Sequence, residues 1–116
     1  TRKYIFPGGY IPALSEIVQA SEPNRLMVTD VESLRLHYGR TCRAWYDRCQ
    51  ANRAAIEALY DARFFRMWSF YLAGAATVFE HGGMLVYQIQ YARDRRALPI
   101  TRDYMAEAEA ALRASA

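Results

Sequence analysis

Two segments of the chain have the composition of β-strands, and a long helical stretch separates them. Residues 26–34 include Met27-Val28-Thr29 and Val31 with partial polar alternation, and residues 84–91 are rich in strand-favouring side chains. Two strands alone form a marginal sheet with edges that natural proteins avoid exposing. The sequence therefore predicts an α/β fold in which both strands pair with strands outside this sequence or in another copy of the chain.

The remaining segments are predicted to be helical. Pro12 suits the first turn of a helix that runs to about residue 21, where Pro23-Asn24 follows. A second helix is expected to start near Arg40 and to continue through Leu59. Trp45, Cys49, Ile56 and Leu59 fall near one stripe of this helix, and Trp45 and Cys49 are expected to be buried there.

Residues 62–79 are apolar nearly all round, which is typical of a buried helix, and Gly82-Gly83 should end it. The same aromatic segment could instead wall a tunnel for a long hydrocarbon, and periodicity does not separate the two interpretations. A last helix, capped by Thr101, is expected to run to about residue 113.

The charge of the chain is mildly positive and is carried almost entirely by arginine. Lysine and arginine total 15 against 12 acidic residues, which gives a net charge of +3. Arginine pairs bidentately with phosphate and carboxylate, so an anionic partner such as a lipid headgroup is compatible with this surface. The excess is too small to indicate nucleic acid. Residues 93–96 could meet lipid phosphates, although a solvated turn is the simpler interpretation.

The two cysteines, Cys42 and Cys49, are predicted to be free. Seven residues of helix separate them by about 10 Å, which is too far for a disulfide. Reduced thiols and the lack of a long apolar run or a signal peptide predict a cytoplasmic protein. The first residue is not Met, so we expect a segment of a longer protein.

Neither metal binding nor thiol catalysis is well supported by the spacing of candidate groups. His37 and His81 are far apart, and no metal-ligand motif is present. Cys42 with His37 could form a nucleophilic pair, but nothing in the sequence orients the imidazole. A thiol on an amphipathic helix is usually a small core residue.

Tyr38 is the strongest candidate for a reactive site. It follows the first predicted strand and precedes the next helix, and in α/β folds such junctions face the ligand crevice. A phenol there can donate a hydrogen bond to an anion without carrying charge. A packing role for this tyrosine stays open on local grounds.

Several segments resemble one family, the cyclopropane-fatty-acyl-phospholipid synthases. The run K-Y-I-F-P-G-G-Y-I-P at residues 3–12 resembles a characteristic family segment. Tyr38, Thr41, Trp45 and Tyr46 match the family pattern Y-x-x-T-L-x-x-W-Y, with Cys42 in place of the usual leucine. The resemblance continues to about Arg93 through Arg63-Phe64, Arg66-Met67, Tyr71-Leu72, Phe79 and the strand that contains Gln88.

The resemblance implies the C-terminal portion of a class I Rossmann-like methyltransferase fold, with residues 1–116 as the C-terminal segment of the catalytic domain. The two predicted strands correspond to its last, antiparallel pair. S-adenosylmethionine is the implied co-substrate, bound mostly by residues upstream of Thr1, so this segment alone should be inactive. The implied reaction adds a methylene group to the cis double bond of a phospholipid acyl chain.

The resemblance also implies roles for particular residues. Tyr38 corresponds to a tyrosine that hydrogen-bonds a bicarbonate ion, which acts as the base of the reaction. The acyl chain would lie against aromatic side chains of the helix predicted at residues 62–79: Phe64, Phe65, Trp68 and Tyr71. The expected location is the inner face of the cytoplasmic membrane, at its periphery, with self-association and no nucleic-acid partner.

Two alternatives stay open at this point. The chain could be a non-catalytic helical module that uses its aromatic helix as a partner surface. It could also belong to a related methyltransferase that acts on another lipid or on a small molecule. The particular lipid, its double-bond position and a cyclopropane or methyl-branched product are not decided by the sequence.

Overall fold

The computed structural model describes residues 3–115. The chain forms two compact units, one comprising the chain up to Pro12 with Val31–Gln88 and the other comprising Ala13–Asp30 with Ile89 onward. Each unit is described separately. The elements in chain order are α1 (Leu14–Ser21), η1 (Glu22–Asn24), β1 (Met27–Leu34), α2 (His37–Ala51), α3 (Arg53–Leu59), α4 (Ala62–His81), β2 (Val86–Ala92) and α5 (Asp103–Ala114).

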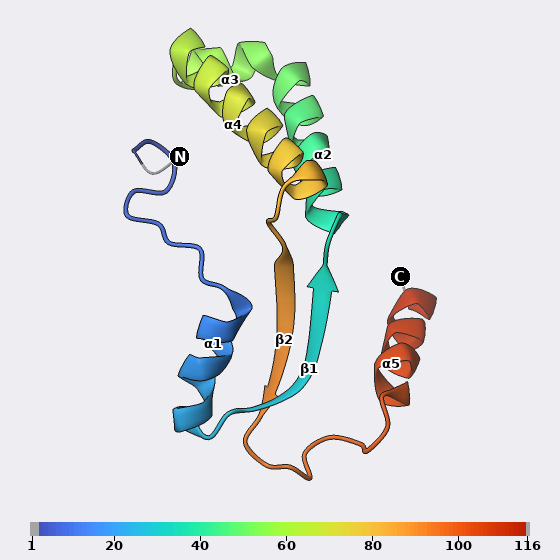
Figure 1. The fold of residues 1–116 in the computed structure, drawn as a ribbon. Helices are drawn as coiled ribbons and strands as arrows, with labels where there is room; N and C mark the ends of the chain where they lie inside the picture. Colours follow the sequence, from blue (N-terminus) through green and yellow to red (C-terminus); the bar gives the residue numbers. More distant parts are fainter. Residues whose placement is uncertain (1–2, 116) are drawn as a thin grey trace. The chain divides into compact units, whose positions relative to one another are not determined.

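The core of the first unit lies between α2 and α4, which run antiparallel and side by side (Figure 1). Helix α2 contributes Cys42 and Cys49, which are seven residues apart and so lie on one stripe. The buried residues of α4 follow helical spacing as well: Phe65, Leu72, Ala76 and Phe79. The buried helix predicted at residues 62–79 is confirmed, although one of its faces remains exposed, with Phe70 at 82%.

Asn52 divides what the sequence predicts as one helix into α2 and α3. Its side-chain amide donates to the carbonyl of Arg48 at 2.8 Å, and its backbone leaves the helical region. Asparagine favours such local breaks because its side chain competes for backbone groups. Helix α2 also begins earlier than the predicted Arg40, so Tyr38 lies inside its first turn.

The ends of α4 are fixed by local chemistry. Asp61 is the N-cap, and its carboxylate accepts from the Phe64 backbone N–H at 2.6 Å. At the other end, a Cβ on Gly82 would lie 2.6 Å from the Val78 carbonyl oxygen. The predicted stop at Gly82-Gly83 is therefore confirmed, and its physical reason is a close backbone approach.

The strands β1 and β2 form a two-stranded antiparallel sheet (Figure 1). Both predicted strands are present, with ends shifted by one or two residues. Most side chains of β1 are exposed. Within residues 3–115 the sheet has only these two strands, so each strand keeps one unpaired edge.

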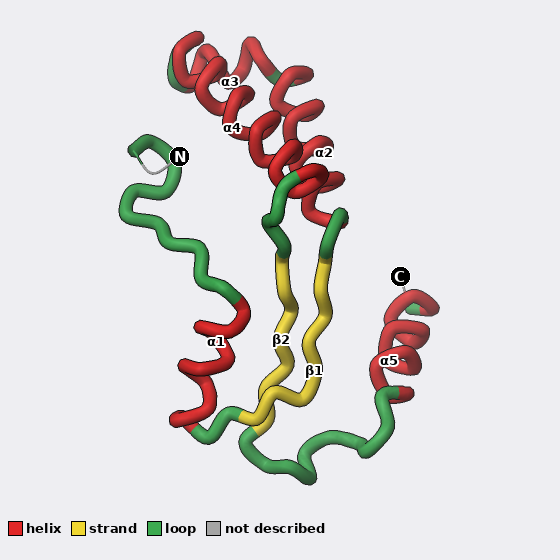
Figure 2. Tube along the Cα trace, in the orientation of Figure 1, coloured by secondary structure: helices red, strands yellow, loops and turns green. Residues whose placement is uncertain are grey.

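In the second unit, a long loop leads from β2 to α5 (Figure 2). Arg102 pairs with Asp30 at 2.7 Å, and the Tyr104 hydroxyl donates to the Gln90 side chain at 2.9 Å. The predicted Thr101 cap is wrong, because Arg102 occupies that position and no side chain caps the helix. Pro12 likewise precedes α1 rather than starting it.

Replacing the N-cap of α4 should destabilise the first unit. In the protein that carries this chain, Asp61→Ala should lower the free energy of unfolding by about 0.5–2 kcal/mol, because the Phe64 N–H loses its acceptor. Denaturant unfolding measures this change. Asp47→Ala, at an exposed position within α2, is the matched control and should change it by less than about 0.5 kcal/mol. Equal effects of the two substitutions would contradict the capping role.

Candidate functional site

Tyr38 lies in the first turn of α2 with its ring half-buried. The ring packs edge-to-face on Phe79 with centroids 4.8 Å apart, and on Trp45 at 5.7 Å. Buried Cys42 and Ala76 complete its surroundings. Two aromatic contacts thus define the plane of the phenol, and the predicted catalytic residue is at the edge of the core.

The first turns of α2 are held close to the end of α4. Gly39 is buried, and a Cβ at this position would lie 3.0 Å from Cγ of Glu80. One turn later, the Arg43 guanidinium makes a bidentate pair with the Glu80 carboxylate, with N···O distances of 2.9 and 2.7 Å. This pair and the close approach at Gly39 fix the segment that carries Tyr38.

A row of aromatic rings follows one side of α4. Tyr60 stacks on Phe64 at 4.2 Å, and Phe64 lies nearly parallel to Trp68 at 6.2 Å. Trp68 contacts Tyr71 at 5.3 Å, and Tyr71 meets Phe6 of the N-terminal loop at 6.1 Å. Three of the four predicted acyl-contact residues, Phe64, Trp68 and Tyr71, are therefore brought together.

Phe65, the fourth predicted acyl-contact residue, lies elsewhere. Its ring is buried against Cys49 and Leu72 in the core, and the Arg53 guanidinium lies 5.0 Å from the ring centroid. Because successive helix residues are about 100° apart, Phe65 cannot share the face of Phe64. The structure places this residue in the α2–α4 core, and Trp68 and Tyr71 of the aromatic row pack against that core cluster from outside.

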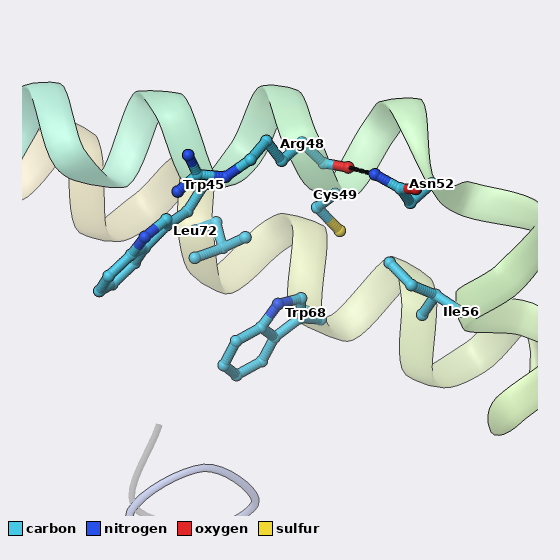
Figure 3. Close-up of a pocket in the computed structure, with 7 residues that line it drawn as sticks. All are labelled: Trp45, Arg48, Cys49, Asn52, Ile56, Trp68 and Leu72. Carbon is cyan, nitrogen blue, oxygen red and sulfur yellow. Dashed lines mark hydrogen bonds between the residues drawn. The ribbon is translucent and has the colours of Figure 1, made fainter.

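An open pocket of about 320 Å³ lies on the same unit (Figure 3). We call it the tryptophan pocket, because Trp45 of α2 and Trp68 of α4 stand on either side of Leu72. The expectation that Trp45 belongs to a buried stripe is wrong, since its side chain is 39% exposed. The complete lining is Trp45, Arg48, Cys49, Asn52, Ile56, Trp68 and Leu72.

The tryptophan pocket connects the predicted catalytic residue with the aromatic row. Trp45 contacts the Tyr38 ring at one end, and Trp68 belongs to the row at the other. Sequence reasoning missed the contribution of α2 to this surface. The sequence did place Trp45, Cys49 and Ile56 near one stripe, but it treated that stripe as buried core rather than as a pocket wall.

The titratable groups beside Tyr38 are held in their neutral forms. Burial raises the pKa of the Cys42 thiol, and the negative charge of Glu80 raises it further. Burial also raises the pKa of Tyr71, with smaller contributions from Tyr38 and Cys42. A thiol with a raised pKa is a poor nucleophile, and His37 is exposed, so the structure disfavours the Cys42–His37 pair.

No group of three or more histidine, cysteine, aspartate or glutamate residues is placed to hold a metal ion within residues 3–115. None of the described helices combines the length and the apolarity that crossing a bilayer would require.

Comparison with known proteins gives consistent matches. The family profile described as mycolic acid cyclopropane synthetase matches residues 1–89. The chain is 39% identical to a probable fatty acid methyltransferase of Pseudomonas putida over 107 residues, covering 89% of this chain and 27% of that protein. It is 36% identical over 91 residues to the cyclopropane-fatty-acyl-phospholipid synthase of Escherichia coli K12, covering 78% of this chain and 24% of that protein.

A solved structure with the same local fold is the mycolic acid cyclopropane synthase CmaA1 complexed with SAH and CTAB. The TM-score is 0.75 at 32% identity, over 78% of this chain and 32% of that chain. The predicted fold class, the C-terminal portion of a Rossmann-like methyltransferase fold, is confirmed by this likeness. The chain spans about a quarter of the length of the curated relatives described above.

The Arg43–Glu80 pair should be visible in the titration of Glu80. Hydrogen bonding to Arg43 holds the pKa of the Glu80 carboxyl below its ordinary value of 4.5. Since the folded-state pKa is the lower one, the stability from this pair is present above the unfolded-state pKa and is lost as the pH falls through the folded-state pKa. In Arg43→Met, carboxyl NMR titration should show the Glu80 pKa rising toward 4.5. Arg40→Met, an exposed arginine of the same helix, should leave it unchanged, and an equal rise there would refute the pair.

Thiol labelling tests the buried state of Cys42. In a Cys49→Ala background at neutral pH, a thiol reagent should modify Cys42 at least about tenfold more slowly in the folded protein than in denaturant. The reason is twofold, because the thiol is buried and its pKa is raised. Labelling as fast as that of an unfolded peptide would restore Cys42 as a candidate nucleophile.

Proposed function

Since the chain belongs to the mycolic acid cyclopropane synthetase family, we propose that it is the C-terminal part of a methyltransferase that modifies unsaturated phospholipids. The enzyme would transfer a methylene group from S-adenosylmethionine to the cis double bond of an acyl chain. Family membership favours this enzymatic interpretation over a non-catalytic interaction module. The relative in Pseudomonas putida, a probable fatty acid methyltransferase, supports lipid methyl transfer as the wider class.

The observation that carries the proposal is the continuity between Tyr38 and the tryptophan pocket. The Tyr38 ring contacts Trp45, and Trp45 lines a pocket whose remaining wall is largely apolar. An acyl chain could lie along Trp45, Leu72 and Trp68 while its double bond reaches the phenol. Apolar walls with few polar groups are what a hydrocarbon chain requires.

The reaction needs charge stabilisation more than bond activation by the protein. The alkene attacks the methyl carbon of the sulfonium, so a C–C bond forms, the C–S bond breaks and a carbocation remains. Loss of one proton from the added methyl group then closes the three-membered ring. Trp45, which contacts the Tyr38 ring, would be the aromatic group to stabilise this cation, and a cation over an indole face gains about 0.5–2 kcal/mol.

Tyr38 is suited to hold an anion near that cation. Its hydroxyl is a neutral donor, and the adjacent Cys42 thiol is also kept neutral by its raised pKa. The thiol therefore adds no negative charge that would repel an anionic base, and the nearby Glu80 carboxylate is paired with Arg43. A bicarbonate ion, when bound, would accept the proton that ring closure releases, and Tyr38 would orient it by a hydrogen bond.

The co-substrate and the membrane enter the proposal through the relatives. CmaA1 has been crystallised with SAH, which is the by-product of methyl transfer from S-adenosylmethionine, and with the long-chain surfactant CTAB. By analogy, this chain supplies the acyl-binding face of a site whose co-substrate half lies elsewhere in the protein. We expect peripheral association with the inner face of the cytoplasmic membrane, and self-association through the unpaired edges of β1 and β2.

Removal of one hydroxyl tests the proposal. In the full-length protein, Tyr38→Phe should lower kcat on phospholipid vesicles by about 10- to 100-fold, the effect of losing one hydrogen bond to a charged group. Binding of S-adenosylmethionine, measured by calorimetry, should be nearly unchanged. The matched control is Tyr60→Phe, which removes a phenol hydroxyl from an exposed ring and should leave turnover intact.

Two results would contradict the proposal in different ways. Unchanged turnover in Tyr38→Phe would remove this residue from the mechanism while leaving the reaction class standing. No methyl transfer to any unsaturated lipid by the unmodified protein, despite tight binding of S-adenosylmethionine, would refute the reaction class itself.

A further inference from the structure

One charged side chain lines the tryptophan pocket, and it is Arg48. We propose that Arg48 binds the phosphate of the lipid whose acyl chain occupies this pocket. The inference rests on the proposed function and narrows it, because it makes an anionic phosphate ester part of what the site recognises. A bare hydrocarbon or an uncharged ester would fill the apolar wall but leave the guanidinium without a partner.

No acidic side chain among residues 3–115 neutralises the charge of Arg48. Its side chain is exposed, and no ion pair to it is found among residues 3–115, whereas Arg43 and Arg53 on neighbouring turns are paired with glutamates. No carboxylate lines the pocket, and the Asn52 amide donates to the Arg48 backbone carbonyl rather than to its side chain. The pocket therefore combines an apolar wall with one unpaired positive charge.

The shape and direction of the side chain also suit a phosphate. Figure 3 shows Arg48 extended along α2 toward Trp45, at the edge of the pocket. A planar guanidinium presents paired N–H donors that match two oxygens of a phosphodiester. Its aliphatic part can meanwhile cover apolar surface, so one residue contacts both the headgroup and the start of the acyl chain.

The separation of Arg48 from Tyr38 sets an upper limit on the distance between a bound phosphate and a double bond at the phenol. Ten residues of helix place their Cα atoms about 15 Å apart along the axis. An extended peptide backbone advances roughly 3.5 Å per residue, which is about 1.2 Å for each of its three bonds. An extended acyl chain advances by about the same length per bond. The span from phosphate to double bond is therefore about twelve bonds or fewer, since Arg48 points toward Trp45.

Substrates with and without a phosphate test the inference. The full-length protein would be assayed on dioleoyl phosphatidylglycerol and on ethyl oleate, each in the same neutral detergent micelles. Arg48→Ala should raise KM for the phospholipid by about 10- to 100-fold, the factor expected when a charge-assisted hydrogen bond is lost. KM for ethyl oleate and kcat for both lipids should stay within about twofold of the unmodified values.

Three controls keep the result specific. Arg48→Lys, which retains charge without the planar fork, should give an intermediate KM. Arg66→Ala removes an exposed arginine of α4 that does not line the pocket, and it should have no effect. Should Arg48→Ala fail to fold, Arg48→Gln replaces it, because it preserves most of the side-chain length.

Direct binding separates this inference from the proposed function. Trp45 and Trp68 are the two tryptophans of the chain, so a brominated acyl chain in the pocket should quench their fluorescence. Quenching by brominated phosphatidylglycerol micelles should require about 10- to 100-fold more lipid in Arg48→Ala, even if no turnover is detected. The inference would be overturned if Arg48→Ala shifted the quenching and the KM values equally for both lipids, or for neither lipid. The inference would also be overturned if inorganic phosphate competed with the lipid while Arg48→Ala left KM for the phospholipid unchanged. The site would then bind the free ion alone.

Discussion

The packing of α2 against α4 is the contact on which the rest of the first unit depends. Cys42 and Cys49 face Ala76, Leu72 and Phe65, and nearly all the fully buried apolar surface of the chain lies in this contact. Each large side chain buried there contributes about 1.5–3 kcal/mol. The phenol of Tyr38 and both walls of the tryptophan pocket are attached to these two helices, so their geometry follows from this contact.

The surface beside this core carries large apolar side chains that do not take part in the core packing. Trp45 is 39% exposed, and Tyr60 and Leu59 are exposed at 63% and 75%. Side chains of this size on a small unit indicate contact with other molecules or with the remainder of a protein. In the proposed function a lipid chain is one such partner, and the tryptophan pocket marks the face that would receive it.

The sequence predicted the elements well and the faces of the helices less well. Strand composition at residues 84–91, the glycines after α4 and the seven-residue spacing of the cysteines each depend on local chemistry, and all three agree with the structure. Phe65 was grouped with Phe64 because a helix that is apolar nearly all round has no hydrophobic stripe to read. Only the neighbouring helix decides which aromatic ring enters the core.

Other misses have a similar origin in competing interactions. The break at Asn52 depends on a side-chain hydrogen bond that periodicity does not report. The start of the last helix at Arg102 accompanies an ion pair with Asp30, far away in the sequence. The position of Tyr38 near a strand–helix junction was predictable from order alone, but its contacts with Phe79 and Trp45 required the packed structure.

Small side chains where α2 and α4 are closest determine how deeply the Tyr38 phenol sits between the two helices. Gly39, Cys42 and Ala76 are all buried, and together they let the backbones approach with no bulky group between them. The depth of the phenol thus depends on the volumes of a methyl group and a thiol as well as on the Arg43–Glu80 pair. Adding or removing one methylene at these positions would change how deeply the phenol sits without altering any group that the proposed mechanism uses.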